Sequence, residues 1–316
     1  MNRIIAMLAT AGACGSPNPG GHPSTSLDAP PGATSDASAP ADAPAASSTD
    51  PAEDGPATVT SSTVQIPATT GHTVPATIYT SPGANALVVI SPGFQMVRTQ
   101  YASYAHHLAT WGFVVVLTDY ADQSFFADHQ VMANDVTEVI TYALAAQPGI
   151  DPAKIAVAGH SLGGDISVLA AAGDPRVKAV VGWDPVDASS PSVVPEHMTG
   201  FTAALAVIGE TTDGSGGFMP CAPTADNYEQ FYAAAPSPAI AMTVDGADHM
   251  DWVDDGTCSV CTLCTAGTAP PDRSHTATRR LNVAWLRAQL LADSTMQPWL
   301  AAPPEVAAGI ATVERK

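Results

Sequence analysis

This chain carries little charge, and very little of that charge is positive. Charged residues make up 13% of its 316 residues, with 11 lysines and arginines against 30 aspartates and glutamates, and the formal net charge is −19 at pH 7. Nucleic-acid binding needs clustered lysines and arginines that neutralise phosphates, so this composition argues against a nucleic-acid partner. Electrostatic attraction to an anionic membrane surface is disfavoured for the same reason.

Long apolar runs are also missing. The N-terminal apolar run, residues 4–9, follows Arg3 and gives way to Ala-Gly-Ala-Cys14. It is too short to span a bilayer, and a positive residue, an apolar run and then small residues are typical of a secretory signal. We therefore predict a signal peptide over residues 1–14. If it is of the lipoprotein type, Cys14 is lipidated, and ordinary cleavage nearby is the alternative. The expected protein is secreted, or anchored to the bacterial cell envelope through Cys14 alone.

Phenylalanine, tyrosine, tryptophan, lysine and arginine are absent from residues 15–57, which consist mainly of Pro, Ala, Ser, Gly and Asp. Such a segment cannot bury enough apolar surface to offset the entropy lost on ordering. We predict a disordered spacer over residues 15–57 and one folded domain over residues 58–316.

Cysteine is scarce, but in an exported protein its few cysteines can form disulfides. With Cys14 set aside, four cysteines remain, which are Cys221, Cys258, Cys261 and Cys264. An even number in an exported domain favours two disulfides, of unknown pairing. The closely spaced last three also resemble a metal knuckle, but a nearby fourth ligand of the usual spacing is missing. We expect disulfides and no metal.

Within the domain, continuous apolar runs alternate with helical patterns. We expect strands at 74–79, 86–90, 113–117, 155–158, 177–181, 204–208 and 240–244. We expect helices at 100–111, 129–146, from just after 161 to 172, and at 276–291. Solid apolar strands are buried on both faces, which is typical of a mainly parallel sheet flanked by helices. The pattern therefore predicts a doubly wound α/β architecture.

A nucleophile motif lies between a predicted strand and a predicted helix. Residues 159–164 read Gly-His-Ser-Leu-Gly-Gly directly after the apolar strand 155–158. A serine on a sharp strand-to-helix turn is exposed above the sheet edge, and glycines leave room for that turn. The helix that follows points its N–H groups at the site. Ser161 is therefore the candidate nucleophile.

Acyl transfer at such a serine also requires donors for an oxyanion. The N–H of Leu162, directly after the nucleophile, is one candidate. The second should come from the loop after an earlier strand, and Ser-Pro-Gly-Phe94 follows the strand 86–90. We therefore assign the oxyanion hole to the backbone N–H groups of Phe94 and Leu162.

The base and the acid should follow the serine in the order acid, then histidine. His249, just beyond the strand 240–244, meets this condition. Two carboxylates qualify as the acid, because Asp184 follows the strand 177–181 and Asp213 follows the strand 204–208. Spacing alone favours Asp213, the commoner place for the acid.

These motifs resemble the chlorophyllase family and, more distantly, the bacterial cutinase-like polyester hydrolases, over residues 86–291. Segments 91–94 and 159–164 are shared with both groups. The more discriminating segments resemble the chlorophyllases, and they are Asp-Pro-Val-Asp at 184–187, Pro-Cys-Ala-Pro at 220–223 and His-Met-Asp at 249–251. The resemblance implies an α/β-hydrolase fold, and it implies that the first Asp of Asp-Pro-Val-Asp is the acid, which selects Asp184 over Asp213. Chlorophyllases often have Arg directly after the nucleophile. This chain has Leu162 at that position, and lipases and polyester hydrolases likewise have an apolar residue there.

The prediction is a serine carboxylic-ester hydrolase that uses Ser161, His249 and Asp184, needs no cofactor, and acts on an ester with an apolar moiety. Whether that ester is chlorophyllase-like or polyesterase- and lipase-like stays open. Thioesterase, amidase or acyltransferase chemistry on the same triad is the first alternative, because fold does not fix substrate. A non-catalytic surface protein is the second, and the complete serine, histidine and acid set argues against it.

Overall fold

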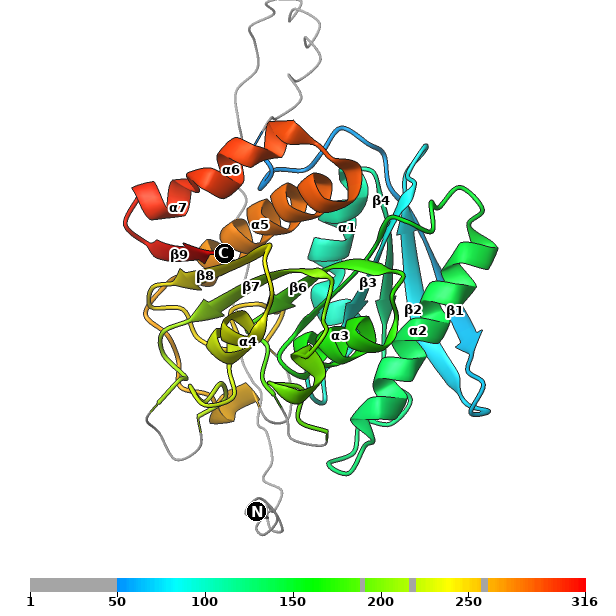
Figure 1. Ribbon diagram of the computed structural model, residues 1–316, viewed down its shortest axis with the longest axis horizontal. Helices are drawn as coiled ribbons and strands as arrows, with labels where there is room; N and C mark the ends of the chain where they lie inside the picture. Colours follow the sequence, from blue (N-terminus) through cyan, green and yellow to red (C-terminus); the bar gives the residue numbers. More distant parts are fainter. Residues whose placement is uncertain (1–49, 188–190, 216–219, 257–260) are drawn as a thin grey trace, which may run out of the picture. The chain divides into compact units, whose positions relative to one another are not determined.

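The strands of the domain form one sheet. The computed structural model describes residues 50–187, 191–215, 220–256 and 261–316, and in them nine strands lie in the order β1-β2-β4-β3-β5-β6-β7-β8-β9 (Figure 1). The strands are β1 (Thr60–Pro67), β2 (Thr73–Thr80), β3 (Ala86–Ser91), β4 (Phe113–Thr118), β5 (Ile155–His160), β6 (Val177–Trp183), β7 (Ala204–Glu210), β8 (Ala239–Val244) and β9 (Ala311–Arg315). The helices are α1 (Ala102–Thr110), α2 (His129–Ala146), α3 (Leu162–Gly173), α4 (Tyr228–Ala234), α5 (Pro271–Leu291), α6 (Gln297–Ala301) and α7 (Pro304–Ala307).

The direction of the strands confirms the predicted fold class. Neighbouring strands from β4 through β3, β5, β6 and β7 to β8 run parallel, whereas β1, β2 and β9 pair antiparallel with their neighbours. Helices cover both faces of this mainly parallel sheet, which is the α/β-hydrolase architecture. All seven predicted strands are present. None of the helices in the described ranges is long and apolar enough to cross a membrane.

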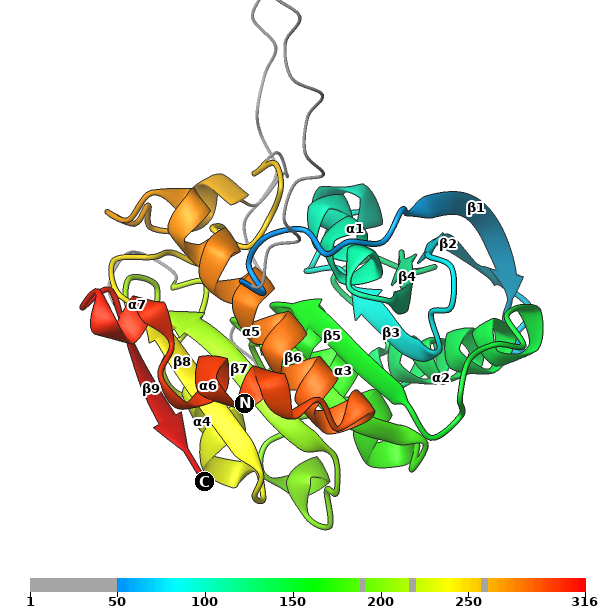
Figure 2. The same cartoon turned by 90° about the horizontal axis from the view of Figure 1, so that it is seen from above.

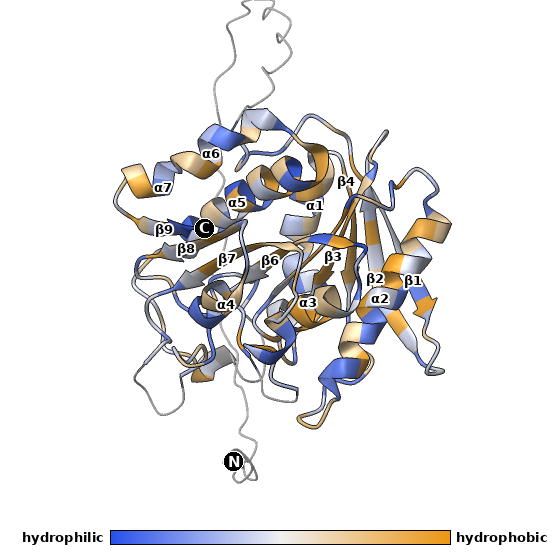
Figure 3. Ribbon diagram, viewed as in Figure 1, coloured by the Kyte–Doolittle hydropathy of each residue, from blue (hydrophilic) through white to orange (hydrophobic). Residues whose placement is uncertain are grey.

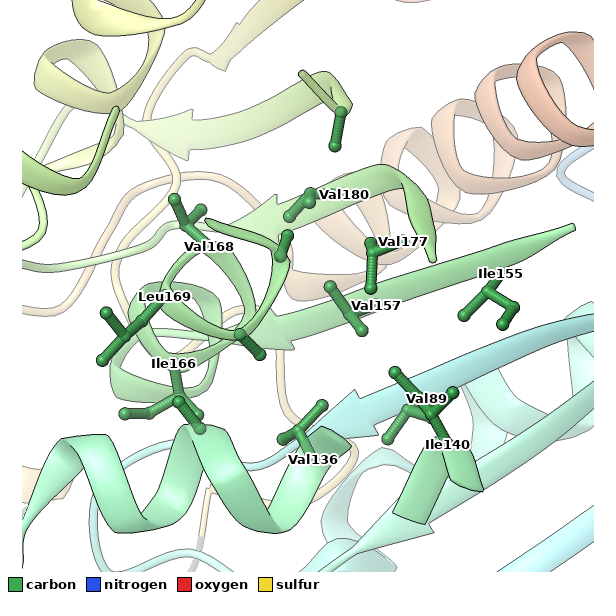
Figure 4. Packing of buried hydrophobic residues seen from close by; sticks show 14 of the residues in the cluster. Val89, Val136, Ile140, Ile155, Val157, Ile166, Val168, Leu169, Val177 and Val180 are labelled. Atoms are coloured by element: carbon green, nitrogen blue, oxygen red, sulfur yellow. The ribbon is translucent and has the colours of Figure 1, made fainter. Parts of the chain in front are cut away.

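Both faces of the sheet are packed because successive side chains of each strand point to opposite sides. On one face, Val89 and Val157 pack with Ile140 of α2 and Ile166 of α3 (Figure 4). On the other face, the alternate strand residues pack against α1 and α5. Burying an aliphatic side chain of this size contributes roughly 1.5–3 kcal/mol, so this double layer is the main source of stability. Figure 3 accordingly shows β3 and β4 in the hydrophobic colour.

The two outermost strands were not predicted from the sequence. They lie at opposite edges of the sheet, where β1 pairs with β2 and β9 pairs with β8 (Figure 2). Most side chains of β1, which reads TSSTVQIP, are exposed. An edge strand with solvated side chains has no continuous apolar run, so the pattern that identifies the central strands is missing.

Residues 50–57, predicted to belong to the disordered spacer, pack on the domain. Asp50 forms an ion pair with Arg280 of α5 at 2.8 Å, and the carbonyl of Glu53 accepts the ring N–H of Trp111 at 2.9 Å. The N–H of Gly55 bonds Thr110 Oγ1 at 2.7 Å. The predicted domain start at residue 58 is therefore wrong, because these polar contacts hold the chain from Asp50 onward. The signal peptide and the rest of the spacer lie outside the described residues.

One disulfide is present among the described side chains. It joins Cys221 to Cys264, which are 43 residues apart in the sequence. The bridge confirms the disulfide reading for these two cysteines. Cys258 and the side chain of Cys261 lie outside the described part, so the second predicted bridge stays a prediction.

Candidate active site

Ser161 lies on the turn between β5 and α3, at the carboxyl edge of the parallel strands. Its backbone has φ 55° and ψ −122°, a conformation that non-glycine residues rarely adopt. The glycines on either side are needed for steric reasons. A Cβ at Gly163 would lie 2.2 Å from the carbonyl oxygen of Ser91, and one at Gly159 would lie 2.3 Å from the carbonyl oxygen of Gly163. The turn thus raises the hydroxyl of Ser161 above the sheet edge, as the motif predicts.

The imidazole of His249 joins this serine to one of the two candidate acids. His249 follows β8, and its Nε2 lies 2.8 Å from Ser161 Oγ. Its Nδ1 lies 2.6 Å from Oδ2 of Asp184, which directly follows β6. An ionised carboxylate only accepts, so the proton between them belongs to Nδ1, and Nε2 is left free to accept from the serine.

Asp213, the acid that spacing favours, contacts the same histidine differently. Its Oδ2 accepts the backbone N–H of His249 at 3.1 Å, and its Oδ1 accepts the N–H of Thr265 at 2.8 Å. Both bonds go to the main chain, so Asp213 holds the loop that carries the imidazole rather than the ring itself. Thr265 follows Cys264, so the disulfide to Cys221 fastens the segment that Asp213 binds.

Burial sets the electrostatics of the acid and the base. Asp184 is completely buried, and this desolvation raises its pKa although the hydrogen bond to His249 opposes the shift. For His249, burial alone would lower the pKa, but the bond and charge of Asp184 outweigh burial and raise the pKa of the imidazole. The carboxylate therefore favours the imidazolium, which is the state that a general base reaches after taking a proton.

A third carboxyl group, Glu210 at the end of β7, lies close to this pair and was not predicted. Burial first, and then the charge of Asp184, raise the pKa of Glu210 to about 7. Its Oε2 accepts the N–H groups of Thr212 and Asp213, the latter at 2.8 Å. The other oxygen, Oε1, is buried without a hydrogen-bond partner among the described residues, as is Oδ1 of Asp184. Burial and the neighbouring carboxylate thus favour the protonated form of Glu210 relative to an exposed glutamate.

A buried hydrogen-bond chain connects the base to the loop after β3. His160 Nε2 lies 2.8 Å from the carbonyl oxygen of His249, which can only accept, so Nε2 carries the ring proton. Burial and the charge of His249 lower the pKa of His160, so the ring is neutral and its Nδ1 accepts. Tyr101 Oη, at 2.9 Å, donates to that Nδ1 and accepts the N–H of Gly93 at 3.1 Å. Met96 Sδ, 3.0 Å from the same hydroxyl, is the weaker acceptor.

The two candidate oxyanion donors lie on the segments that this chain of bonds connects. Leu162 is the first residue of α3, so its N–H has no acceptor within the helix. Phe94 follows Gly93 on the loop after β3, and β3 and β5 are paired up to Ser91 and Gly159. Both N–H groups thus belong to backbone at the same sheet edge as Ser161.

The described residues contain no group of three or more histidine, cysteine, aspartate or glutamate side chains that could hold a metal ion. The cysteine run that suggested a metal knuckle is only partly described.

The sequence of this chain is similar to those of known ester hydrolases. The protein-family model described as Chlorophyllase matches residues 48–311. The chain is 27% identical over 261 residues to the bis(hydroxyethyl) terephthalate hydrolase of Streptomyces coelicolor, covering 79% of this chain and 73% of that protein. It is 27% identical over 167 residues to cutinase 1 of Thermobifida cellulosilytica, covering 51% and 59%. It is 25% identical over 197 residues to chlorophyllase-1 of Arabidopsis thaliana, covering 55% and 60%. The chain thus spans about three-fifths of the length of these last two relatives.

Proposed function

The chain belongs to the chlorophyllase family and is a carboxylic ester hydrolase, and we propose that it works through an acyl-enzyme formed on Ser161. The observation that carries this proposal is the position of one imidazole. Its Nε2 lies 2.8 Å from Ser161 Oγ while its Nδ1 lies 2.6 Å from Asp184. These are hydrogen-bond distances on both sides of one ring, which is the arrangement that activates a serine.

The reaction follows from these contacts. His249 Nε2 takes the hydroxyl proton as Ser161 Oγ bonds to the ester carbonyl carbon, and the carbonyl π electrons move to oxygen. The N–H groups of Phe94 and Leu162 stabilise that oxyanion, and Asp184 stabilises the imidazolium. When the tetrahedral intermediate collapses, the bond to the alcohol breaks and Nε2–H protonates the leaving alkoxide. Water then bonds to the acyl carbon as Nε2 takes one of its protons. The bond from that carbon to Ser161 Oγ breaks, Nε2–H returns the proton to Oγ, and the acid is released.

The substrate that we propose is an uncharged ester with an apolar moiety, of the polyester or small aryl-ester kind. The names of the relatives support this class, because they include a hydrolase of bis(hydroxyethyl) terephthalate and a cutinase. The residue after the nucleophile is the apolar Leu162, as in lipases and polyester hydrolases, and its side chain is buried in the core. We also propose that the chain is exported, either released or attached to the cell envelope through a lipid on Cys14. Incorporation of a tagged fatty acid that Cys14→Ala abolishes would establish the anchor, and absence of label would favour release.

Single-residue variants test the mechanism directly. Ser161→Ala should lower kcat on a soluble nitrophenyl ester by about 10⁴-fold or more, because loss of a triad nucleophile typically costs several orders of magnitude. Ser167→Ala is the matched control, since Ser167 is a buried serine of α3, the helix that begins directly after Ser161, and its hydroxyl donates to the carbonyl oxygen of Gly163. A folded Ser161→Ala protein within tenfold of the parent would rule out the proposed nucleophile. Thioesters and anilides assayed in parallel separate ester hydrolysis from the alternative reactions.

A further inference from the structure

Exposed apolar side chains gather on two loops beside the candidate active site. Among the described residues, five large apolar side chains are strongly exposed, namely Val97 (43%), Phe125 (65%), Phe126 (76%), Leu263 (50%) and Val306 (41%). Val97 lies at the end of the loop that follows β3, and the two phenylalanines lie on the loop that leads from β4 into α2 (Figure 1). Val97, Phe125 and Phe126 are called the apolar patch below. Single exposed apolar residues are ordinary, but a cluster of them marks an interaction surface.

Specific contacts hold the two loops together, so the patch is a fixed surface. The side chain of Gln123 donates to the carbonyl oxygen of Met96 at 3.1 Å. The backbone N–H of Arg98 donates to Asp119 at 2.6 Å, and their side chains also form an ion pair. Asp128 then caps the first turn of α2. The phenylalanines are therefore exposed on an anchored loop, so binding does not have to order that loop.

The apolar patch borders the catalytic machinery through one residue. The rings of Phe94 and Phe125 pack edge to face with centroids 5.0 Å apart. The backbone N–H of Phe94 is the proposed oxyanion donor, and its neighbour Gly93 is bonded to Tyr101 in the chain that reaches His249. A molecule resting on the patch is thus next to the place where an ester carbonyl must lie for attack.

The charges around the patch identify what it can bind. Residues 92–97 contain no charged side chain, and residues 119–128 contain three aspartates and no lysine or arginine. Asp119 is paired with Arg98, which leaves no cation on the loop to neutralise an anionic headgroup. An anionic membrane is therefore repelled, whereas an uncharged apolar surface gains contact without desolvating a fixed charge.

We propose that the apolar patch docks this enzyme onto the surface of an insoluble, uncharged polyester, so that an ester group of that surface reaches Ser161. This proposal rests on the ester hydrolase function proposed above and adds the physical form of the substrate. A small dissolved ester is held within the site and has no contact with rings that are exposed outside it. A solid surface extends beyond the site and buries them.

Adsorption of a catalytically silent protein tests the patch without turnover. In the full chain with Ser161→Ala, binding to an amorphous polyester film is measured by depletion from solution. Adding Val97→Ser and Phe126→Ser should weaken adsorption at least about tenfold, because burial of each exposed side chain is worth about that factor. Phe125 is kept because it packs on Phe94. Phe126→Leu should retain most of the binding, and Val306→Ser, an equally apolar exposed change on α7, should have no effect.

Catalytic assays separate this proposal from the function on which it rests. In the active enzyme, the Val97→Ser and Phe126→Ser pair should keep kcat/KM on a soluble ester within about twofold, as exposed substitutions usually do, while losing rate on the film. If the parent enzyme does not hydrolyse the soluble ester, the proposed function fails. If the parent is active but the double variant adsorbs to the film as well as the parent does, the docking patch is refuted. Equal adsorption of the parent to anionic vesicles would also refute it.

Discussion

Changing Asp184 to Asn should abolish most of the activity while leaving substrate binding intact. The two side chains have the same shape, but the amide is neutral and can present an N–H₂ group to His249 Nδ1. The neutral amide lacks the charge that stabilises the imidazolium, and its N–H₂ group would hold the ring in the wrong tautomer. Asp184 is fully buried and lies 2.6 Å from Nδ1, so no water substitutes for the lost contact. In a serine protease with the same arrangement the equivalent change costs about 10⁴-fold in kcat, or roughly 5 kcal/mol of barrier.

The matched control is Asp213→Asn, at the carboxylate that spacing favours. Asp213 accepts two backbone N–H groups, and an asparagine oxygen can keep only one of them. We expect a stability loss of about 1–3 kcal/mol and a fall in kcat of less than about tenfold, since the ring keeps its partner. The assay is kcat and KM on a soluble nitrophenyl ester, with thermal unfolding of each variant. If Asp184→Asn keeps most activity and Asp213→Asn abolishes it, the acid is Asp213 and the contact between Asp184 and the ring of His249 does not govern catalysis.

Three further variants concern groups that pack around the site. Tyr101→Phe removes the acceptor of the Gly93 N–H and the donor to His160. We expect kcat to fall by about tenfold with little change in KM, and the free energy of unfolding to fall by about 1–3 kcal/mol. An unchanged kcat would show that these hydrogen bonds do not position the site. The raised pKa of Glu210 contributes stability that is present below its ordinary pKa of 4.5 and lost as pH rises through about 7. Glu210→Gln should therefore flatten the fall in unfolding free energy between about pH 5 and about pH 8 in urea titrations, and an unaltered profile would contradict the assignment. Cys221→Ser opens the bridge to Cys264 and should cost about 2–4 kcal/mol of unfolding free energy, measured under non-reducing conditions; equal stability would mean that the bridge does not constrain the chain.

The sequence predicts the central sheet well and its margins poorly, for physical reasons. The central strands are buried on both faces, so each is a run of apolar residues that differs from everything around it. The edge strands β1 and β9 lack that run because solvent covers one side of them. Residues 50–57 are likewise polar, and what holds them is an ion pair to Arg280, 230 positions away, which no local pattern reveals.

In the site too, the residues that a local motif identifies could be predicted, whereas those that depend on tertiary contacts could not. Ser161 could be predicted because the strand, the turn glycines and the helix are adjacent in the sequence. The acid could not be selected by spacing, because Asp184 and Asp213 follow neighbouring strands and both reach His249; only the ring contact separates them. Resemblance to the chlorophyllase family selected the carboxylate that lies on the ring. Glu210 and the Tyr101–His160 bonds were missed because they arise only when β3, β5, β7 and β8 are brought together.

Acylation of Ser161 during turnover can be observed directly. The full chain is mixed with an excess of a slowly deacylating nitrophenyl ester, quenched in acid within the first turnover, and analysed by intact and peptide mass spectrometry. The proposed mechanism predicts a mass increase of one acyl group on the peptide that contains Ser161, formed with a stoichiometric burst of nitrophenol and absent from Ser161→Ala. Turnover with no adduct, or with the acyl group on another residue, would contradict it.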